Sequence, residues 1–166
     1  MRRLGGLVCL VLVLWLGGCA TQVPLPGGGA PAGSDPAAAA RAASAWARVL
    51  DRFVNAQGEV DFEALAADRA DLDIMVRQVA ATPHDSLAGW PAQMAWLINA
   101  YNALSMFNVV DSGIPDSHSG LNKLRFFISR QFNIGGRWLS LYRFENEVIR
   151  PLGRQQADPR LHFALN

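Results

Sequence analysis

Few side chains in this 166-residue sequence combine the type and the spacing that binding or catalysis requires. Asn99 and Asn102 are three residues apart in an apolar stretch, so on a helix they share one face and could bracket a ligand or a loop backbone. A buried amide must find hydrogen-bond partners or it destabilises the fold. We therefore favour a structural interpretation, in which the pair pins a neighbouring segment, over direct contact with a substrate.

Glu145, Glu147 and His162 offer oxygen and nitrogen ligands of the kind that bind metal ions. The two glutamates are two residues apart, so on a helix their side chains point in different directions. The sequence contains no HExxH-like pair of histidines with the i, i+4 spacing of a helical metal motif. The sequence therefore predicts no metal site, and nothing in it indicates a cofactor.

Charge and cysteine content exclude several classes of protein. The sequence has fifteen Lys and Arg residues and fourteen Asp and Glu residues, so its net charge is +1. This balance excludes nucleic-acid binding through a broad basic field. Cys9 and Cys19 are the two cysteines, and both lie in the first 20 residues. The part expected to fold has no thiol, which excludes a disulfide framework and a cysteine nucleophile supplied by these residues.

The first 19 residues predict export and a lipid anchor. Two arginines follow Met1, and residues 7–16 form an apolar run of about the length of a signal-peptide core, shorter than the roughly 20 residues of a spanning helix. The sequence LGGC at 16–19 resembles a bacterial lipobox, in which the cysteine sulfur accepts a diacylglycerol. We expect residues 1–18 to be a signal peptide and Cys19 to be the lipidated N-terminus. An uncleaved anchor and a plain secretory signal are the alternatives.

The anchor predicts where the protein lies. Ala20, rather than Asp, follows Cys19, as in lipoproteins that a Gram-negative cell sorts to the outer membrane, where they face the periplasm. The membrane is therefore the first expected partner. Residues 19–40 are rich in Pro, Gly and Ala and lack apolar periodicity, which predicts a tether. Residues 41–166 are expected to form the globular domain.

Apolar spacing and turn residues predict an α+β fold. The first half is rich in helices, and a small antiparallel sheet combines a hairpin around Gly135-Gly136 with a strand over 160–166. N-cap residues are expected at Ser34 or Asp35, at Asp61 and at Ser140. The predicted helices span 36–55, 63–81, 90–111 and 141–151, and the third is apolar on nearly every side, which is typical of a central helix.

Four strings in order resemble the bacterial domain of unknown function 547 family. They are VDF at 60–62, AWLINAYNAL at 95–104, FNIGGRWLSLYRFENEVIRP at 132–151 and DPRLHFALN at 158–166. The resemblance implies no established activity, and it implies export, because members are often secreted or lipid-anchored. Members continue beyond the position of Asn166 with a cysteine-containing stretch and further helices. We therefore expect this chain to be an N-terminal portion of the domain and to be unstable by itself.

The resemblance also implies which polar residues matter. The positions that match the family's polar positions are Asn99, Asn102, Glu145, Arg150, Arg160, His162 and Asn166. Asn102, Arg150, Arg160 and Asn166 are expected to form a structural polar network.

One hypothesis is a cysteine hydrolase. His162 would act as the general base, Glu145 or Asn99 would orient it, and a cysteine beyond Asn166 in longer relatives would be the nucleophile. Tyr142, Arg143 and Asn146 stand where members commonly have acidic residues and a histidine, which weighs against a histidine partner for Glu145. The other hypothesis is an envelope lipoprotein that binds a protein or a small molecule without catalysis, or that has a structural role.

Overall fold

The computed structural model describes residues 20–29, 31, 35–115 and 120–155. Several predictions lie outside these residues. They are the signal peptide over 1–18, lipidation of Cys19, the strand over 160–166 and the roles of Arg160, His162 and Asn166.

The first long helix, α1 (Pro36–Phe53), begins where the sequence predicts. The Asp35 side chain accepts a hydrogen bond from the backbone N–H of Ala38 at 2.9 Å, and Pro36 occupies the first helical position, where no backbone donor is needed. Trp46 and Val49 belong to the face that α1 buries against the core. The helix is followed by a loop that returns to the second helical segment.

The helix predicted over 63–81 is divided in the structure. Asp61 caps α2 (Phe62–Ala67), as predicted, and α3 (Ala70–Ala81) follows after a break at Asp68 and Arg69. The prediction of a single helix is therefore wrong at this point. Asp68 leaves the helical conformation, with φ of −136° and ψ of 72°, and its carboxylate binds Arg52 of α1 at 2.7 Å. Aspartate is a poor residue for a helix interior, and here it gains an ion pair instead.

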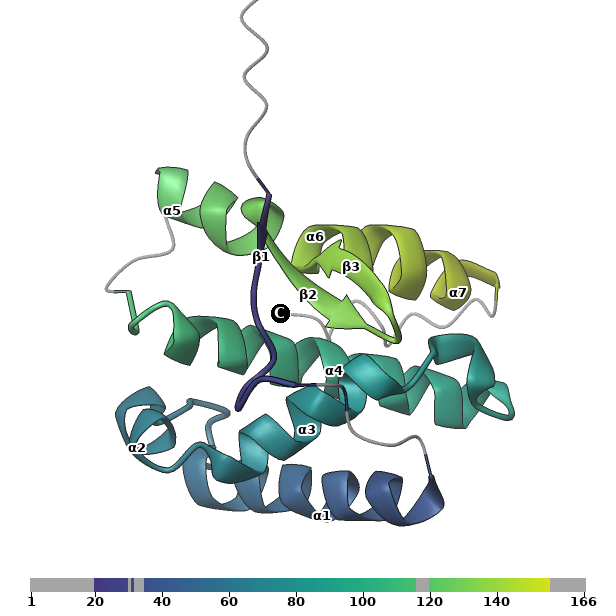
Figure 1. The fold of residues 1–166 in the computed structure, drawn as a ribbon, viewed down its shortest axis with the longest axis horizontal. Helices are drawn as coiled ribbons and strands as arrows, with labels where there is room; N and C mark the ends of the chain where they lie inside the picture. Colours follow the sequence, from purple (N-terminus) through teal and green to yellow (C-terminus); the bar gives the residue numbers. More distant parts are fainter. Residues whose placement is uncertain (1–19, 30, 32–34, 116–119, 156–166) are drawn as a thin grey trace, which may run out of the picture.

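Helix α4 (Trp90–Asp111) is the centre of the fold and has the predicted bounds. It packs against α2 and α3 on one side and against the helical residues 141–149 on the other (Figure 1). Leu97, Ala100, Ala103 and Leu104 are fully buried. An apolar surface all round a helix requires such a position, because every face must be removed from water.

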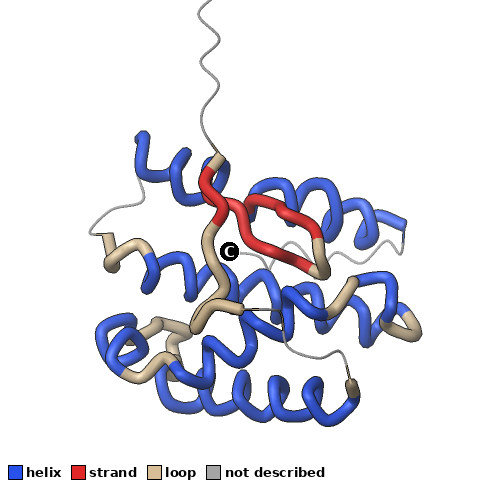
Figure 2. Tube along the Cα trace, in the orientation of Figure 1, coloured by secondary structure: helices blue, strands red, loops and turns tan. Residues whose placement is uncertain are grey.

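A small sheet lies against α3, and its Phe132 ring makes an edge-to-face contact with Phe107 of α4 (Figure 2). Strands β2 (Arg130–Ile134) and β3 (Arg137–Ser140) form the predicted hairpin. The turn residues Gly135 and Gly136 have φ of +56° and +86°, and Gly135 also passes close to the backbone of Pro83.

The third strand of the described sheet is β1 (Thr21–Gln22), which pairs with β2 in parallel. The sheet is therefore mixed, and the prediction of an antiparallel sheet is corrected in this respect. Val23 is 4% exposed, and its N–H donates to the carbonyl of Gln131 at 2.8 Å. Burial of this side chain and pairing of the β2 edge explain why residues from the predicted tether join the fold.

The remaining helical segments flank the sheet. Helix α5 (Gly120–Leu124) continues into the π-helical segment η2 (Arg125–Ser129), which leads into β2. After β3, the Ser140 side chain caps α6 (Leu141–Arg143), as predicted, and the chain continues through the π-helical η3 (Phe144–Ile149) and α7 (Arg150–Gln155). A short turn, η1 (His84–Ser86), precedes α4. None of the helices in the described ranges is long and apolar enough to cross a membrane.

Candidate functional site

Glu145 lies in a partly buried polar cluster between α4 and η3. Its carboxylate accepts a hydrogen bond from the Tyr101 hydroxyl at 3.1 Å and from Arg150 Nε at 2.8 Å. Burial raises the pKa of Tyr101 above its ordinary value, and the negative charge of Glu145 adds to this effect. Tyr101 therefore remains a protonated donor. Arg150 pairs with Glu145 in the structure, and the expected network of Arg150 with Asn102, Arg160 and Asn166 stays a prediction.

Asn99 lies on a different side of the same helix and has a different partner. Its side-chain oxygen accepts a hydrogen bond from the indole N–H of Trp46 on α1 at 3.1 Å. Trp46 is 5% exposed, so its N–H needs an acceptor within the protein. Asn99 thus pins α1 to α4, which agrees with the structural interpretation. Asn102 is half-buried on the same helix.

The residues of the hydrolase hypothesis are not joined by the described contacts. Asn99 faces Trp46, whereas Glu145 faces Tyr101 and Arg150. His162 lies outside the described residues, so its place relative to either group stays a prediction. Within the ranges that the structure describes, no group of three or more His, Cys, Asp or Glu side chains gathers as a metal site would require.

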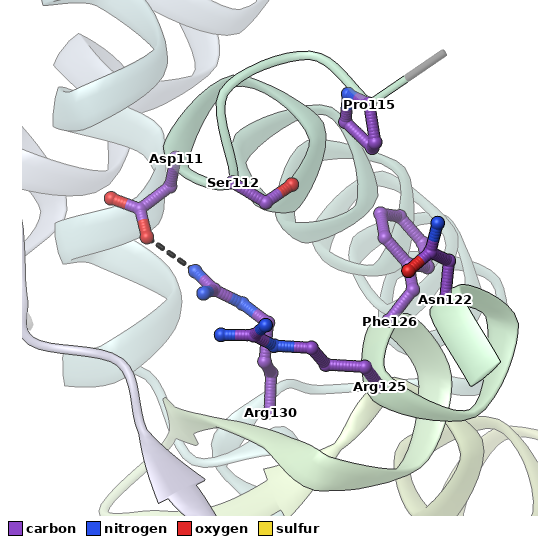
Figure 3. A pocket seen from close by; sticks show the side chains of 7 residues that line it. All are labelled: Asp111, Ser112, Pro115, Asn122, Arg125, Phe126 and Arg130. Carbon is purple, nitrogen blue, oxygen red and sulfur yellow. Dashed lines mark hydrogen bonds and ion pairs between the residues drawn. The ribbon is translucent and has the colours of Figure 1, made fainter. Parts of the chain in front are cut away.

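A cavity of about 280 Å³ opens between the end of α4 and the start of β2. Its size is near the lower end for small-molecule sites. The lining residues are Asp111, Ser112, Pro115, Asn122, Arg125, Phe126 and Arg130. Figure 3 shows Arg125 and Arg130 both reaching into this cavity, with the Asp111 carboxylate bonded to Arg130. We call this hollow the arginine cavity.

The walls of the arginine cavity are fixed by contacts within the protein. Asn108 is fully buried and donates from its side chain to the carbonyl of Phe126 at 3.0 Å, which ties η2 to α4. The last carbonyls of α4 are satisfied by the chain that follows. The backbone carbonyl of Asn108 accepts from the N–H and the hydroxyl of Ser112, and the backbone carbonyl of Val110 accepts from the N–H of Gly113. The end of the helix therefore does not require the arginines as caps.

The arginine cavity carries an excess of positive charge. Asp111 forms an ion pair with Arg130, whose side chain is 13% exposed. Arg130 Nε is buried and has no hydrogen-bond partner among the described residues. Arg125 is exposed, and no ion pair joins it to a side chain in the described part of the chain. Two guanidinium groups that line one cavity repel each other, and the single carboxylate of the lining pairs with only one of them. The arrangement is suited to a bidentate anion such as a carboxylate or a phosphate.

Sequence reasoning missed the arginine cavity. Asp111, Arg125 and Arg130 are separated by up to 19 residues and share no motif. One signal was present: residues 117–144 contain five cationic residues and no Asp or Glu. Such a run in a chain of balanced charge indicates a locally positive surface.

Comparison with known proteins agrees with the resemblance in the second half of the chain. Residues 86–166 match the family model described as Protein of unknown function, DUF547. This confirms the resemblance over the strings at 95–104, 132–151 and 158–166, and the string at 60–62 lies before the match. No curated protein and no solved structure matches the chain.

Proposed function

We propose that this protein is a lipid-anchored module of the bacterial cell envelope that binds a small anionic ligand in the arginine cavity. The ligand class is a carboxylate or a phosphate monoester. The module acts by binding rather than by catalysis in this proposal. Its anchor is the acylated Cys19, and its body is the uncharacterised module that the family match describes.

The proposal rests on Arg125 and Arg130, which line the same cavity with a single carboxylate between the end of α4 and the start of β2. An anion that bridges them relieves their mutual repulsion and supplies an acceptor for the unpartnered Arg130 Nε. Phe126 is buried beside them and limits the access of water, which strengthens a charged contact. Asp111 holds Arg130 in place before the ligand arrives, so less side-chain entropy is lost on binding.

The anchor is supported by the first 19 residues. A short positive start, an apolar core over 7–16 and the LGGC string occur in the order that lipoprotein processing requires. Several acyl chains together hold a protein on a membrane stably, since each buried CH₂ contributes about 0.8 kcal/mol.

The binding claim is tested by anion-dependent stability of the full chain in detergent. Inorganic phosphate and citrate serve as probes, and the melting temperature Tm is followed by circular dichroism at constant ionic strength. At 100 times its Kd, a bound anion stabilises the native state by about 2.7 kcal/mol. We expect the Tm to rise with one of these probes and saturate, and Arg125→Gln to remove the effect.

Arg137→Gln is the matched control, because Arg137 is an exposed arginine of the same sheet that does not line the cavity. It should retain the saturable rise in Tm. Equal responses of both variants would contradict binding in the arginine cavity. A chain whose Tm responds to neither anion would contradict the proposed ligand class.

A further inference from the structure

Three chain segments meet at one end of the sheet. Thr21 of β1 pairs with Arg130, the first residue of β2, and Gln131 pairs with Ser140, the last residue of β3. The start of β1, the π-helical η2 that leads into β2, and α6 that follows β3 are therefore neighbours. Figure 1 shows α5 and the start of β1 at the same side of the molecule.

Exposed apolar side chains are concentrated at this end. Leu124, Ile128 and Tyr142 are 52%, 48% and 53% exposed and belong to α5, η2 and α6. They are the most exposed large apolar side chains of the described residues. Leu50 and Ile74 come next, on α1 and α3, which lie on the far side of α4 in Figure 1. Exposed apolar surface that is gathered at one place is typical of an interaction site.

Positive charge accompanies these apolar side chains. Lys123 and Arg125 flank Leu124 in the sequence, and both are exposed. Residues 117–144 contain no Asp or Glu, so this stretch of the chain is positively charged. Basic residues beside exposed apolar ones are suited to a membrane surface with anionic lipids, because the cations meet the headgroups while the apolar groups enter the interface.

The position of the anchor identifies the occupant of this surface. Cys19 is two residues before Thr21 in the sequence, and two residues of chain span at most about 7 Å, so a lipid on Cys19 would keep the start of β1 close to the membrane. The segment that follows is fastened to the body. Val23 N–H donates to Gln131, and Arg77 donates to the carbonyls of Pro26 and Gly28 at 3.0 and 2.8 Å. Residues 21–28, which follow the proposed anchor, are therefore held against the body of the protein.

We propose that the end of the sheet that carries Lys123, Leu124, Ile128 and Tyr142, the lipid-facing patch, rests on the anionic bilayer in which Cys19 is anchored. The inference depends on the proposed anchor. It goes further, because it assigns one orientation to the protein: η2 and the start of α6 lie at the headgroups, and α1 points away from the membrane.

Site-specific labelling of the full, lipidated chain tests this orientation. In the proposed lipoprotein, Cys9 leaves with the signal peptide and the Cys19 sulfur carries the diacylglycerol in a thioether, so an introduced cysteine is the one free thiol of residues 19–166. We attach an environment-sensitive fluorophore in Ile128→Cys and, separately, in Tyr142→Cys. The protein is reconstituted into vesicles of phosphatidylethanolamine and phosphatidylglycerol. We expect a blue shift at both positions and loss of fluorescence when brominated lipids are used.

Ile74→Cys is the matched control, because this side chain is 42% exposed and lies on α3. Its label should keep the emission of an aqueous environment and should not be quenched. Mass spectrometry of the N-terminal peptide separates the two claims. An unmodified Cys19 would overturn the proposed anchor. An acylated Cys19 with equal emission and quenching at positions 74, 128 and 142 would overturn the lipid-facing patch and leave the anchor intact.

Discussion

Replacement of Glu145 by glutamine tests whether the polar cluster between α4 and η3 holds these elements together. The Glu145 side chain is 15% exposed and that of its partner Arg150 is 29% exposed. Glutamine keeps the size of the side chain and one acceptor oxygen for Tyr101 but removes the negative charge. The Arg150 guanidinium then lies against a neutral amide.

The expected cost follows from the strength of the two contacts. Hydrogen bonds to charged groups contribute about 1.5–3 kcal/mol, and those between neutral groups contribute about 0.5–1.5 kcal/mol. Partial exposure of Arg150 lets water replace some of the lost interaction. We therefore expect Glu145→Gln to lower the free energy of unfolding by about 1.5 kcal/mol. For a domain of this size that corresponds to a decrease in Tm of about 5 °C.

Urea denaturation followed by tryptophan fluorescence, together with a thermal melt, measures this effect. Glu147→Gln is the control, because Glu147 also pairs with an arginine, Arg143, but both side chains are about half exposed. A surface pair of this kind adds little to stability. Equal loss of stability in the two variants, or unfolding of Glu145→Gln at the same urea concentration as the wild type, would refute a stabilising role of the Glu145 charge.

Three further predictions concern other contacts. Gly135→Ala should destabilise the protein in urea much more than Gly136→Ala, because both have positive φ but a Cβ at Gly135 would lie 2.6 Å from the backbone of Pro83, whereas Gly136 faces open space. Asn99→Leu should lower the free energy of unfolding by about 1–3 kcal/mol, because it leaves the buried Trp46 N–H without its acceptor. A urea unfolding curve that coincides with that of the wild type would contradict a stabilising role of this hydrogen bond. The hydrogen bond from Arg48 lowers the pKa of Asp71 below its ordinary value of 3.8. The ion pair therefore stabilises the fold above pH 3.8, and this stabilisation is lost as the pH falls through the lower pKa of the folded state. In Asp71→Asn, the free energy of unfolding should change less with pH over this acidic range.

Local signals in the sequence predicted much of the fold. Asp35 with Pro36, and Ser140, each specify a helix start through nearest neighbours, and the Gly135-Gly136 pair specifies the hairpin turn in the same way. The apolar surface of α4 predicted its central position, because only a central helix can bury every face.

Contacts between distant residues could not be predicted in this way. Strand β1 pairs Thr21 with Arg130, more than 100 residues away, and the Pro and Gly around it are as common in tethers as in docked segments. The arginine cavity likewise depends on how η2 packs against the end of α4. Asn99 and Glu145 lie on helical segments that pack together, but the Asn99 side chain contacts Trp46 whereas the Glu145 side chain contacts Tyr101. The sequence does not reveal how two packed helices are rotated about their axes, so it could not predict this difference.

The membrane anchor is the claim on which the account most depends, and mass spectrometry of the mature N-terminus tests it most directly. The protein is isolated from bacterial membranes, digested, and its first peptide is measured. We predict that the mature chain begins at Cys19 and carries a diacylglycerol with fatty acyl chains, and that Cys19→Ser yields an unprocessed, unacylated chain. An N-terminal peptide that begins elsewhere, or an unmodified Cys19 in the wild-type protein, would contradict the account.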